Sequence, residues 1–452
     1  MIKTLPKNLI RLAKCCPYPL YVVGGRVRDY VAGLTTEDVD TDICAPVSAE
    51  DFVARATQCG FTVTACYKNT GTVKIACGND SFEFTCFRSD EYVRGEHVPA
   101  NIFFTQDINL DARRRDFKCN AVYYDIKNEC IVDPLGGIED IKNKRIDTVV
   151  LPEKVFGEDG LRLMRLARIS AQTGFAPSKE CVEGARKNCG LIRDVSVERV
   201  TAELKLILHA DEKYGVKYAQ YEGLKILKSI HVLQILLPEL CEGDGMEQRK
   251  DFHNYDVLEH SLRCVAYADN SIRLAALLHD VGKPYCLKNY NAFTVHEVVG
   301  AKIANRICER LKVPKKVTEE VERLIKVHMY DLRGDTRENK VRRFIVENVD
   351  IFDKILYIKQ ADFSACRDCL DVAPSVTRLK GIYQKMVEEG LPLTLKELNI
   401  KGNDLIDLGF PPAKVGITLK KLLMDCCINA VTNQKEKLAK YARKVYLARS
   451  KR

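Results

Sequence analysis

A pair of glycines near the N-terminus has the composition and setting of a phosphate-binding turn. Gly24 and Gly25 follow the short apolar run 21–23 and precede Arg28. Because glycine has no Cβ, backbone N–H groups in such a turn can approach a phosphate closely, and a helix that starts there adds a positive dipole end. Arg28 could donate its forked N–H groups to phosphate oxygens. The pattern predicts a polyphosphate site.

Two aspartates follow at the spacing of a strand. Asp40 and Asp42 lie in the run 39–43, whose hydrophobicity alternates in period two, so both carboxylates should share one face. Adjacent carboxylates suit Mg²⁺, with substrate phosphates completing its ligands. Two such ions could activate an attacking hydroxyl and support a leaving pyrophosphate. A Gly-Gly pair alone usually marks a turn and a D-x-D alone a solvated edge, but their combination favours a nucleotide site.

The elements that must hold these residues change character along the chain. Strand patterns occur at 21–23, 39–43, 73–76, 82–87 and 121–125, with a helix at 49–59 for which Ser48 is the expected N-cap. After about residue 144, helical patterns dominate, beginning with 160–171 and 197–208. We predict four domains, namely an α/β head at 1–145, a helical neck and body at 146–250, a helical metal-binding domain at 251–372 and a helical tail at 373–452.

Further motifs follow in a fixed order. They are DARRRDFKCNA from Asp111, DPLGG from Asp133, EDGLR from Glu158 and SVERV from Ser196. Together with GG-x-x-RD and D-x-D, they resemble the signature of the class II CCA-adding enzymes and bacterial poly(A) polymerases, which are polymerase-β-like nucleotidyltransferases. The likeness spans about 21–203. It departs at Lys118-Cys119, where the family usually has Thr and an apolar residue, although the Arg, Asp and Asn around them remain.

This resemblance implies a fold and a set of roles. The fold is an α/β nucleotidyltransferase head followed by an all-α neck, body, HD domain and tail. By resemblance, Asp40 and Asp42 bind Mg²⁺ and are catalytic, while Gly24, Gly25 and Arg28 hold the triphosphate. The remaining nucleotide-binding positions implied by the family motifs are Arg115, Asp116, Asn120, Asp159, Arg162 and Arg165.

Base selection is assigned by the same resemblance to Asp159 and Arg162. Three residues apart on a helix, they would share a face. One accepts and the other donates hydrogen bonds, so together they could read cytosine and adenine, and a missing partner would cost a wrong base about 1–3 kcal/mol per group. The polar segment 88–101 reads as a mobile loop that, by resemblance, helps the switch from CTP to ATP. Glu83 is either a third metal ligand or a surface residue.

A second group of chemically suited residues lies between 251 and 372. It consists of imidazoles and carboxylates on separate helical stretches, namely His260, His279, Asp280, His296, His328 and Asp362. These are ligands of Zn²⁺, Mn²⁺, Fe and Ni²⁺, and helices of a bundle can bring them to one point. The order resembles the H…HD…D pattern of HD phosphohydrolases, with His296 and His328 matching extra ligands of two-metal members. The resemblance implies phosphatase and 2′,3′-cyclic phosphodiesterase activity. The alternative is an HD fold retained only for packing.

Composition sets broad limits. The net charge of +9 permits a polyanionic partner. No run approaches the roughly 20 apolar residues of a membrane span and the start lacks a secretory signal, so we expect a cytoplasmic protein with no membrane partner. The 19 cysteines should then be reduced. Cys366 and Cys369 form a single C-x-x-C, for which small buried residues are the preferred interpretation over a zinc or redox pair.

The sequence thus predicts an enzyme that adds CCA to the 3′ end of tRNA from CTP and ATP. The basic segment 435–452 is either a tRNA contact or a solvated helix. Two alternatives remain at this point in the same class, a poly(A) polymerase and an enzyme that adds only CC or only A. The alternatives from other classes are an HD phosphohydrolase with a nucleotide- or RNA-sensing head and an RNA-binding scaffold without turnover.

Overall fold

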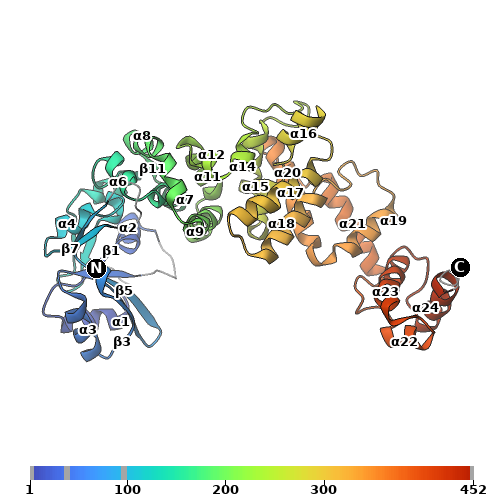
Figure 1. Ribbon diagram of the computed structural model, residues 1–452, viewed down its shortest axis with the longest axis horizontal. Helices are drawn as coiled ribbons and strands as arrows, with labels where there is room; N and C mark the ends of the chain where they lie inside the picture. Colours follow the sequence, from blue (N-terminus) through green and yellow to red (C-terminus); the bar gives the residue numbers. More distant parts are fainter. Residues whose placement is uncertain (1–4, 35–40, 93–98, 448–452) are drawn as a thin grey trace. The chain divides into compact units, whose positions relative to one another are not determined.

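The chain folds into two compact units in the computed structural model, which describes residues 5–34, 41–92 and 99–447. Unit 1 comprises the chain up to Cys241 together with Ile307–Val313, and unit 2 comprises Glu242–Arg306 together with Pro314–Arg452. In Figure 1, unit 1 runs from blue to green and unit 2 from yellow-green to red. No helix of the described residues is long and apolar enough to cross a membrane.

Unit 1 begins with a mixed seven-stranded sheet. Its strand order is β3-β4-β5-β2-β1-β8-β9, and β2 and β5 are its parallel pair. The strands are β1 (Tyr21–Val23), β2 (Asp42–Ala45), β3 (Thr62–Tyr67), β4 (Thr72–Cys77), β5 (Asp80–Cys86), β8 (Tyr123–Asp125) and β9 (Cys130–Val132). Two two-stranded sheets accompany it, β6 (Arg88–Glu91) with β7 (Asn101–Phe104) and β10 (Arg145–Ile146) with β11 (Ala176–Pro177).

The sheet is covered by helices whose apolar faces pack on it. In α3 (Ala49–Gln58), the Phe52 ring stacks on Phe84 of β5 with centroids 3.6 Å apart. Ser48 accepts a hydrogen bond from the Asp51 N–H and caps α3, which confirms the predicted N-cap. The other helices of this part are α1 (Lys7–Cys15), α2 (Gly25–Ala32), α4 (Ile108–Arg113) and α5 (Gly137–Lys142), with 3₁₀ turns at Lys68–Thr70 and Lys118–Asn120.

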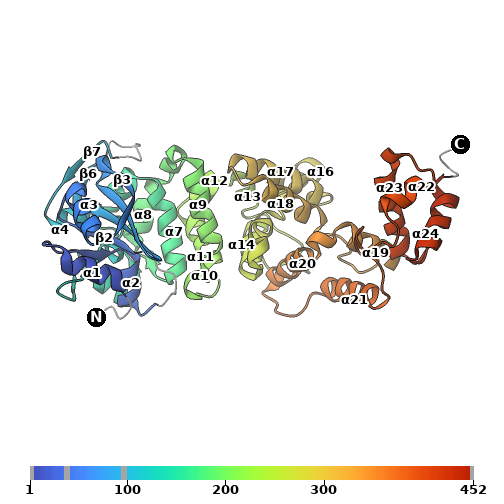
Figure 2. The same cartoon turned by 90° about the horizontal axis from the view of Figure 1, so that it is seen from below.

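The rest of unit 1 is helical. Its helices are α6 (Pro152–Glu158), α7 (Leu161–Thr173), α8 (Lys179–Lys187), α9 (Val197–Leu208), α10 (Asp211–Tyr214), α11 (Ala219–Ser229), α12 (Val232–Leu236) and α13 (Pro238–Cys241), with a 3₁₀ turn at Cys189–Asp194. Helices α7, α9 and α11 lie side by side (Figure 2). Gly223 permits this packing, because a Cβ there would come within 2.7 Å of the Ile207 side chain.

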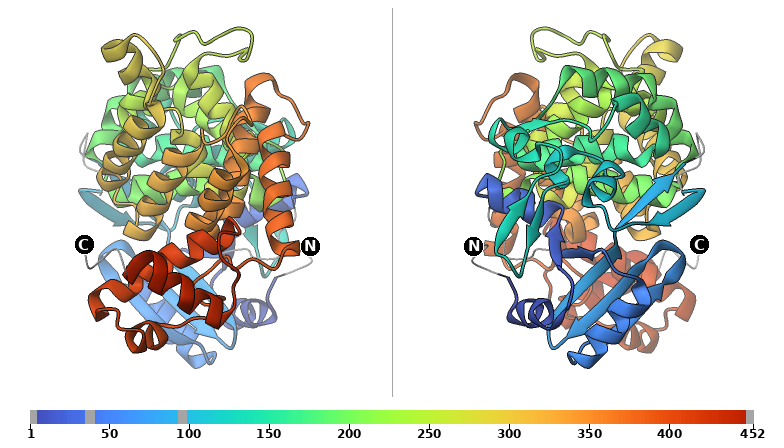
Figure 3. Two further views of the ribbon diagram at one scale, coloured as in Figure 1. Left: turned by 90° about the vertical axis from the view of Figure 1, so that its right-hand side faces the viewer. Right: turned by 90° about the vertical axis from the view of Figure 1, so that its left-hand side faces the viewer.

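Unit 2 is entirely helical in its described part. Its helices are α14 (Val257–Tyr267), α15 (Arg273–Leu278), α16 (Lys283–Tyr290), α17 (His296–Arg310, ending in unit 1), α18 (Lys315–Val327), α19 (Glu338–Glu347), α20 (Phe352–Arg367), α21 (Pro374–Glu388), α22 (Gly402–Asp407), α23 (Pro412–Cys427) and α24 (Lys435–Ala442). Shorter turns lie at Asn270–Ile272, Val349–Ile351 and Arg443–Leu447. Helices α14, α15, α18 and α20, yellow to orange in Figure 3, pack together.

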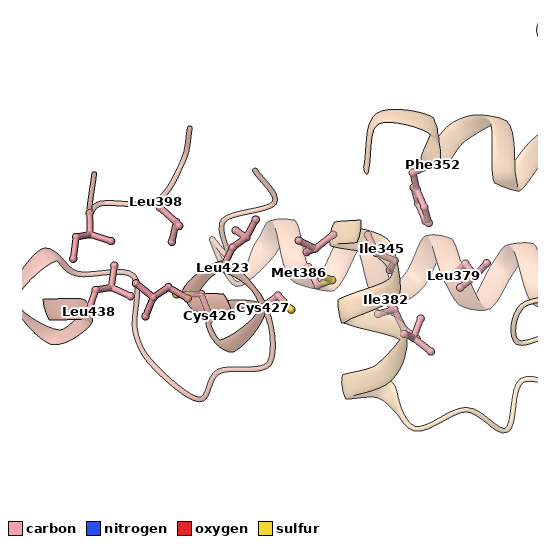
Figure 4. Close-up of a cluster of buried hydrophobic side chains, with 14 of the residues drawn as sticks. Ile345, Phe352, Leu379, Ile382, Met386, Leu398, Leu423, Cys426, Cys427 and Leu438 are labelled. Atoms are coloured by element: carbon pink, nitrogen blue, oxygen red, sulfur yellow. The ribbon is translucent and has the colours of Figure 1, made fainter. Parts of the chain in front are cut away.

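A continuous apolar core joins the later helices of unit 2. Figure 4 shows side chains of α19, α20 and α21, among them Ile345, Phe352 and Leu379, together with Leu423 of α23 and Leu438 of α24. All five residues are at most 5% exposed. Burial of this set stabilises the tail against α19–α21, at roughly 25 cal/mol for each Å² of apolar surface removed from water.

The structure corrects one sequence prediction in part. Residues 88–91 and 101–104 form a β-hairpin rather than a loop, because the polar side chains satisfy one another, as in the ion pair between Arg88 and the 1%-exposed Asp90 side chain. Residues 93–98 between them lie outside the described part. Within that part β2 begins at Asp42, and Asp40 likewise lies outside the described residues.

Candidate functional site

The Gly-Gly turn and Asp42 lie together in the structure. Strands β1 and β2 are antiparallel with Val23 opposite Asp42, so the turn after β1 meets the start of β2. Gly24 has φ +82°, a conformation that favours glycine, and a Cβ there would lie 3.5 Å from Asp42 Oδ2. Asp42 is exposed at the start of its strand. A carboxylate thus faces a turn that continues into helix α2, which suits a cation bound between it and a phosphate.

Glu83 occupies the neighbouring position on β5. It is the register partner of Asp42 across the parallel β2–β5 pair, so the two side chains start from the same face of the sheet. The Glu83 carboxylate also forms a 3.1 Å ion pair with Lys74 of β4. Because both partners are about half exposed, this surface pair is weak and leaves the third-ligand hypothesis open to experiment.

Arg28 is oriented into the protein instead of toward solvent. It is 3% exposed, and its guanidinium donates to Asp29 Oδ1 at 2.7 and 2.9 Å and to Asn120 Oδ1 at 2.8 Å. A further contact reaches the Tyr214 hydroxyl at 3.2 Å. A buried guanidinium must be satisfied locally, and these acceptors take up most of its donors. Arg28 therefore ties the Gly-Gly turn to the Asn120 segment, which sequence spacing did not indicate.

Asp116 is the centre of a second buried network. It is 6% exposed and accepts from Arg165 of α7 at 2.6 and 2.8 Å, from Asn120 Nδ2 at 3.2 Å and from the Phe117 N–H at 2.8 Å. Burial alone would raise the pKa of Asp116, but the Arg165 charge outweighs it and lowers the pKa to about 2. Three residues implied in nucleotide binding therefore form one contiguous group.

Arg115 is fixed by a carboxylate in the same way. It donates to Asp111 Oδ2 at 2.9 and 3.2 Å, and Asp111 also accepts from Arg114 and from the Tyr123 hydroxyl. Burial would raise the pKa of Asp111, yet the Arg115 and Arg114 charges lower it to about 2. Neither Asp111 nor Tyr123 had a predicted role. The available sequence signal for Asp111 was its position three and four residues before Arg114 and Arg115.

Asp159 and Arg162 do not share one helix, so the face argument for them is wrong. Helix α6 ends at Glu158, Asp159 is extended at φ −145°, and α7 starts at Leu161. The break occurs because the chain passes close to another segment, where a Cβ on Gly160 would lie 2.6 Å from a backbone oxygen.

Three of the five N–H donors of Arg162 have protein acceptors. Its guanidinium donates to Glu158 at 2.8 Å and to the backbone carbonyls of Val155 and Arg114 at 2.9 Å each. Asp159 Oδ1 accepts from the Leu161 N–H at 2.9 Å. The pair therefore joins the start of α7 to the preceding motif, and these hydrogen bonds fix the orientation of the Arg162 guanidinium.

Unit 2 contains a buried histidine–carboxylate centre that includes all six predicted residues. His260, His279 and Asp362 offer ligand atoms within 4.8 Å of one another, as do Asp280, His296 and His328. The Nε2 atoms of His260 and His279 lie 3.0 and 3.7 Å from Asp362 Oδ1. Asp280 lies between the two sets, with Oδ2 3.2 Å from His279 Nε2 and Oδ1 3.2 Å from His296 Nε2.

The hydrogen bonds of this centre direct Nε2 atoms toward its carboxylates. The Nδ1 atoms of His279, His296 and His328 lie 2.6–2.8 Å from the carbonyls of Ala276, Phe293 and Ile325. Because a carbonyl only accepts, each Nδ1 carries a proton, which leaves Nε2 as the ligand atom. Burial, with His279 and His296 nearby, lowers the pKa of His328 to about 3, so it is neutral near pH 7. Burial would also lower the pKa of His279, but the Asp280 and Asp362 carboxylates raise it, so a cation bound there would displace the Nε2 proton. The donor set of nitrogen and oxygen fits divalent cations.

Lys283 was not anticipated at this centre. It begins α16 three residues after Asp280, and its Nζ lies 2.6 Å from Asp280 Oδ2 and 2.6 Å from Gln248 Oε1. The Lys283 ammonium group neutralises the Asp280 carboxylate on one side and orients it. The only sequence signal was the i, i+3 spacing directly after the adjacent His-Asp pair.

Three family models match the chain in sequence order. They are the Poly A polymerase head domain at residues 20–147, the probable RNA and SrmB-binding site of polymerase A at 174–243 and the HD domain at 253–357. Proteins with nucleotidyltransferase and HD domains typically bind divalent metals, in keeping with the ligand groups found here.

Similar proteins match the chain over most of its length. The A-adding tRNA nucleotidyltransferase of Deinococcus radiodurans is 29% identical over 84% of each chain. The CCA-adding enzyme of Lactobacillus helveticus is 26% identical over 97% of this chain and 96% of its own. The fold is similar to that of the Bacillus stearothermophilus CCA-adding enzyme solved with CTP, with a TM-score of 0.68 and 22% identity over 99% of this chain and 100% of that one.

Proposed function

We infer, since the chain belongs to the family of class II CCA-adding enzymes and bacterial poly(A) polymerases and carries an HD domain, that it adds CMP and AMP from CTP and ATP to the 3′ end of tRNA. The observation that carries this inference is the Asp42 carboxylate beside the Gly24 turn, inside the segment that matches the head-domain model. The matched RNA-binding segment follows it in unit 1.

In the proposed head reaction, Asp40 and Asp42 hold Mg²⁺ and the Gly24-Gly25 turn receives the triphosphate. Metal bound there would activate the 3′ hydroxyl and support the leaving pyrophosphate. Arg28 keeps the turn in place through Asn120. The chain itself holds the phosphate-binding turn and the carboxylates at a fixed separation before the substrate binds.

Selection of the base is assigned in this proposal to Asp159 and Arg162. The hydrogen bonds around Arg162 determine how much free energy a mismatched base loses. Glu158 and the backbone carbonyls hold the Arg162 guanidinium in place, and its remaining N–H groups can donate to a base. A cytosine or adenine edge would satisfy these donors, whereas a mismatched edge leaves a donor unsatisfied at about 1–3 kcal/mol. Asp116, Asn120, Arg115 and Arg165 position the sugar from the adjoining networks.

For unit 2 we propose hydrolysis of phosphate esters at RNA 3′ ends, including 2′,3′-cyclic phosphates. Metal at the centre, of the Mn, Ni, Fe or Zn class, would supply the activated water. The residues His260, His279, Asp280 and Asp362 hold one cation, and Asp280 with His296 and His328 holds the other. The support is the convergence of four histidines and two aspartates in two adjoining ligand groups, with Nδ1 of three of the histidines held by backbone carbonyls.

A crossed pair of variants tests both assignments. tRNAs ending before C, CC and CCA are incubated with each nucleoside triphosphate singly and the products are sequenced, while a separate assay follows hydrolysis of a 2′,3′-cyclic end. Asp42→Asn should lower incorporation by about a hundredfold or more and spare hydrolysis, and His279→Ala should do the reverse. Uniform long A tails would contradict CCA addition.

The A-only alternative has a specific support, since the Deinococcus radiodurans protein similar to this chain bears that name. In the same assay an A-only enzyme extends only the tRNA that already ends in CC and incorporates no CMP. Incorporation of two C residues into the shortest tRNA therefore separates the two functions.

A further inference from the structure

Beside the HD centre lies a group of three side chains, two of which have no role in the proposed functions. His253, His260 and Cys366 offer ligand atoms that all lie within 4.8 Å of one another. His260 also belongs to the HD set, whereas His253 precedes α14 and Cys366 lies near the end of α20. The imidazole rings of His253 and His260 meet edge to face with centroids 4.9 Å apart.

The backbone holds these residues in register. On α20, Cys366 follows Asp362 by four residues, so both side chains lie on the same helix face. The Asn254 N–H donates to the Cys366 carbonyl at 3.0 Å, and the Arg367 guanidinium donates to the Asp251 carbonyl. The segment that carries His253 is thus tied at two points to the end of α20, which keeps the imidazole and the thiol close without any bound group.

The histidines of this group differ from the other HD histidines in one respect. His279, His296 and His328 each direct Nδ1 at a backbone carbonyl. The Nδ1 atoms of His253 and His260 are buried, and no hydrogen-bond partner for them occurs in the described part of the chain. His260 as a whole is 0% exposed. An unsatisfied buried nitrogen is costly, and nitrogens beside a thiol that lack partners are ones that a cation can satisfy.

We propose that His253, His260 and Cys366 form a further metal subsite, with a sulfur ligand, next to the HD centre. Its occupant is a borderline-soft divalent cation of the zinc class, because thiolate and imidazole ligands together select such ions. The two ligand sets of the HD centre contain only nitrogen and oxygen. The subsite therefore uses Cys366 with two histidines and not with Cys369. It shares His260 with the HD centre: Nε2 faces Asp362 and the unpartnered Nδ1 serves the subsite, so the ring releases its remaining proton to solvent when both cations are bound. Its other two ligands, His253 and Cys366, have no part in the proposed transfer and hydrolysis reactions.

Cobalt substitution of the full-length protein tests the subsite directly. Co²⁺ bound to a thiolate gives a sulfur-to-metal charge-transfer absorption in the near ultraviolet that nitrogen and oxygen ligands do not give. Metal-free wild type is titrated with Co²⁺, and the charge-transfer absorption and the bound cobalt per chain are measured. Cys366→Ser should lose this absorption and bind one cobalt fewer. Cys369→Ser is the matched control and should keep both.

A second variant covers the case in which Cys366→Ser does not fold, as judged by circular dichroism. His253→Gln removes one nitrogen ligand while it leaves the thiol in place, and it should weaken the cobalt affinity of the charge-transfer species at least ~10-fold. The proposal is overturned if wild type shows no charge-transfer absorption, if the absorption survives in Cys366→Ser, or if His253→Gln leaves its affinity unchanged. Its failure leaves nucleotide incorporation untouched, so the two inferences fail separately.

Discussion

Asp116 and Arg165 form an ion pair, and removing one partner should cost a different amount of folding stability from removing the other. The Asp116 side chain is 6% exposed, whereas the Arg165 side chain is 36% exposed. Arg165→Met leaves a buried carboxylate without its cation, and such losses cost about 3–5 kcal/mol. Asp116→Asn leaves an arginine that water can reach, so we expect a smaller loss of about 1–2 kcal/mol.

The pKa shift gives an independent estimate of the same interaction. The pKa of Asp116 is lowered from an ordinary 3.8 to about 2. At about 1.4 kcal/mol for each pKa unit, this corresponds to roughly 2.5 kcal/mol of stability near neutral pH. Since the folded pKa is depressed, the contribution is complete above about pH 5 and is lost as the pH falls toward 2. The difference between wild type and Asp116→Asn should therefore shrink over that interval.

Hydrogen–deuterium exchange of peptides covering 111–125 measures the effect locally, which matters because two units need not unfold together. The opening free energy is compared for wild type, Arg165→Met and Asp116→Asn at pH 7 and at pH 3. Lys187→Met, which breaks an exposed ion pair with Glu153, is the control and should cost about 0–1 kcal/mol. Equal losses in the two Asp116–Arg165 variants, or a pH-independent difference for Asp116→Asn, would refute the reasoning.

Other positions give equally definite expectations. Gly24→Ala should destabilise unit 1 by about 1–2 kcal/mol and lower its melting temperature, because a φ of +82° strains any residue with a Cβ. Nucleotide incorporation should fall as well, and an unchanged calorimetric transition would contradict this prediction. If the unit 2 centre binds metal as proposed, a chelator should lower the calorimetric transition of unit 2, and Mn²⁺ at a hundred times its dissociation constant should restore about 3 kcal/mol. Gly223→Val should cost about 1–3 kcal/mol by urea denaturation through its clash with Ile207, while a neutral result would mean that α11 can shift.

The sequence by itself determined the kinds of chemistry in this protein and the local elements that carry them. A capping serine before an apolar helix predicted α3, and the glycine turn after an apolar strand predicted the junction of β1 and α2, because these signals act through neighbours in the chain. The residue types and order around His279 and Asp280 likewise predicted a histidine–carboxylate centre, which the structure confirms. Register placed Asp42 beside Gly24 without a signal from either residue alone.

Only the tertiary structure decided where the charged side chains point. The sequence predicted that the Arg28 guanidinium would donate to a phosphate. In the structure it donates inward to Asn120 and Tyr214, which lie 92 and 186 residues further along the chain. Cys366 was predicted to be a small buried residue, but it is only half-buried and folding placed it beside His253. The physical reason is that a buried polar group binds whichever partner the fold brings within hydrogen-bond distance, and that partner is set by packing between distant segments.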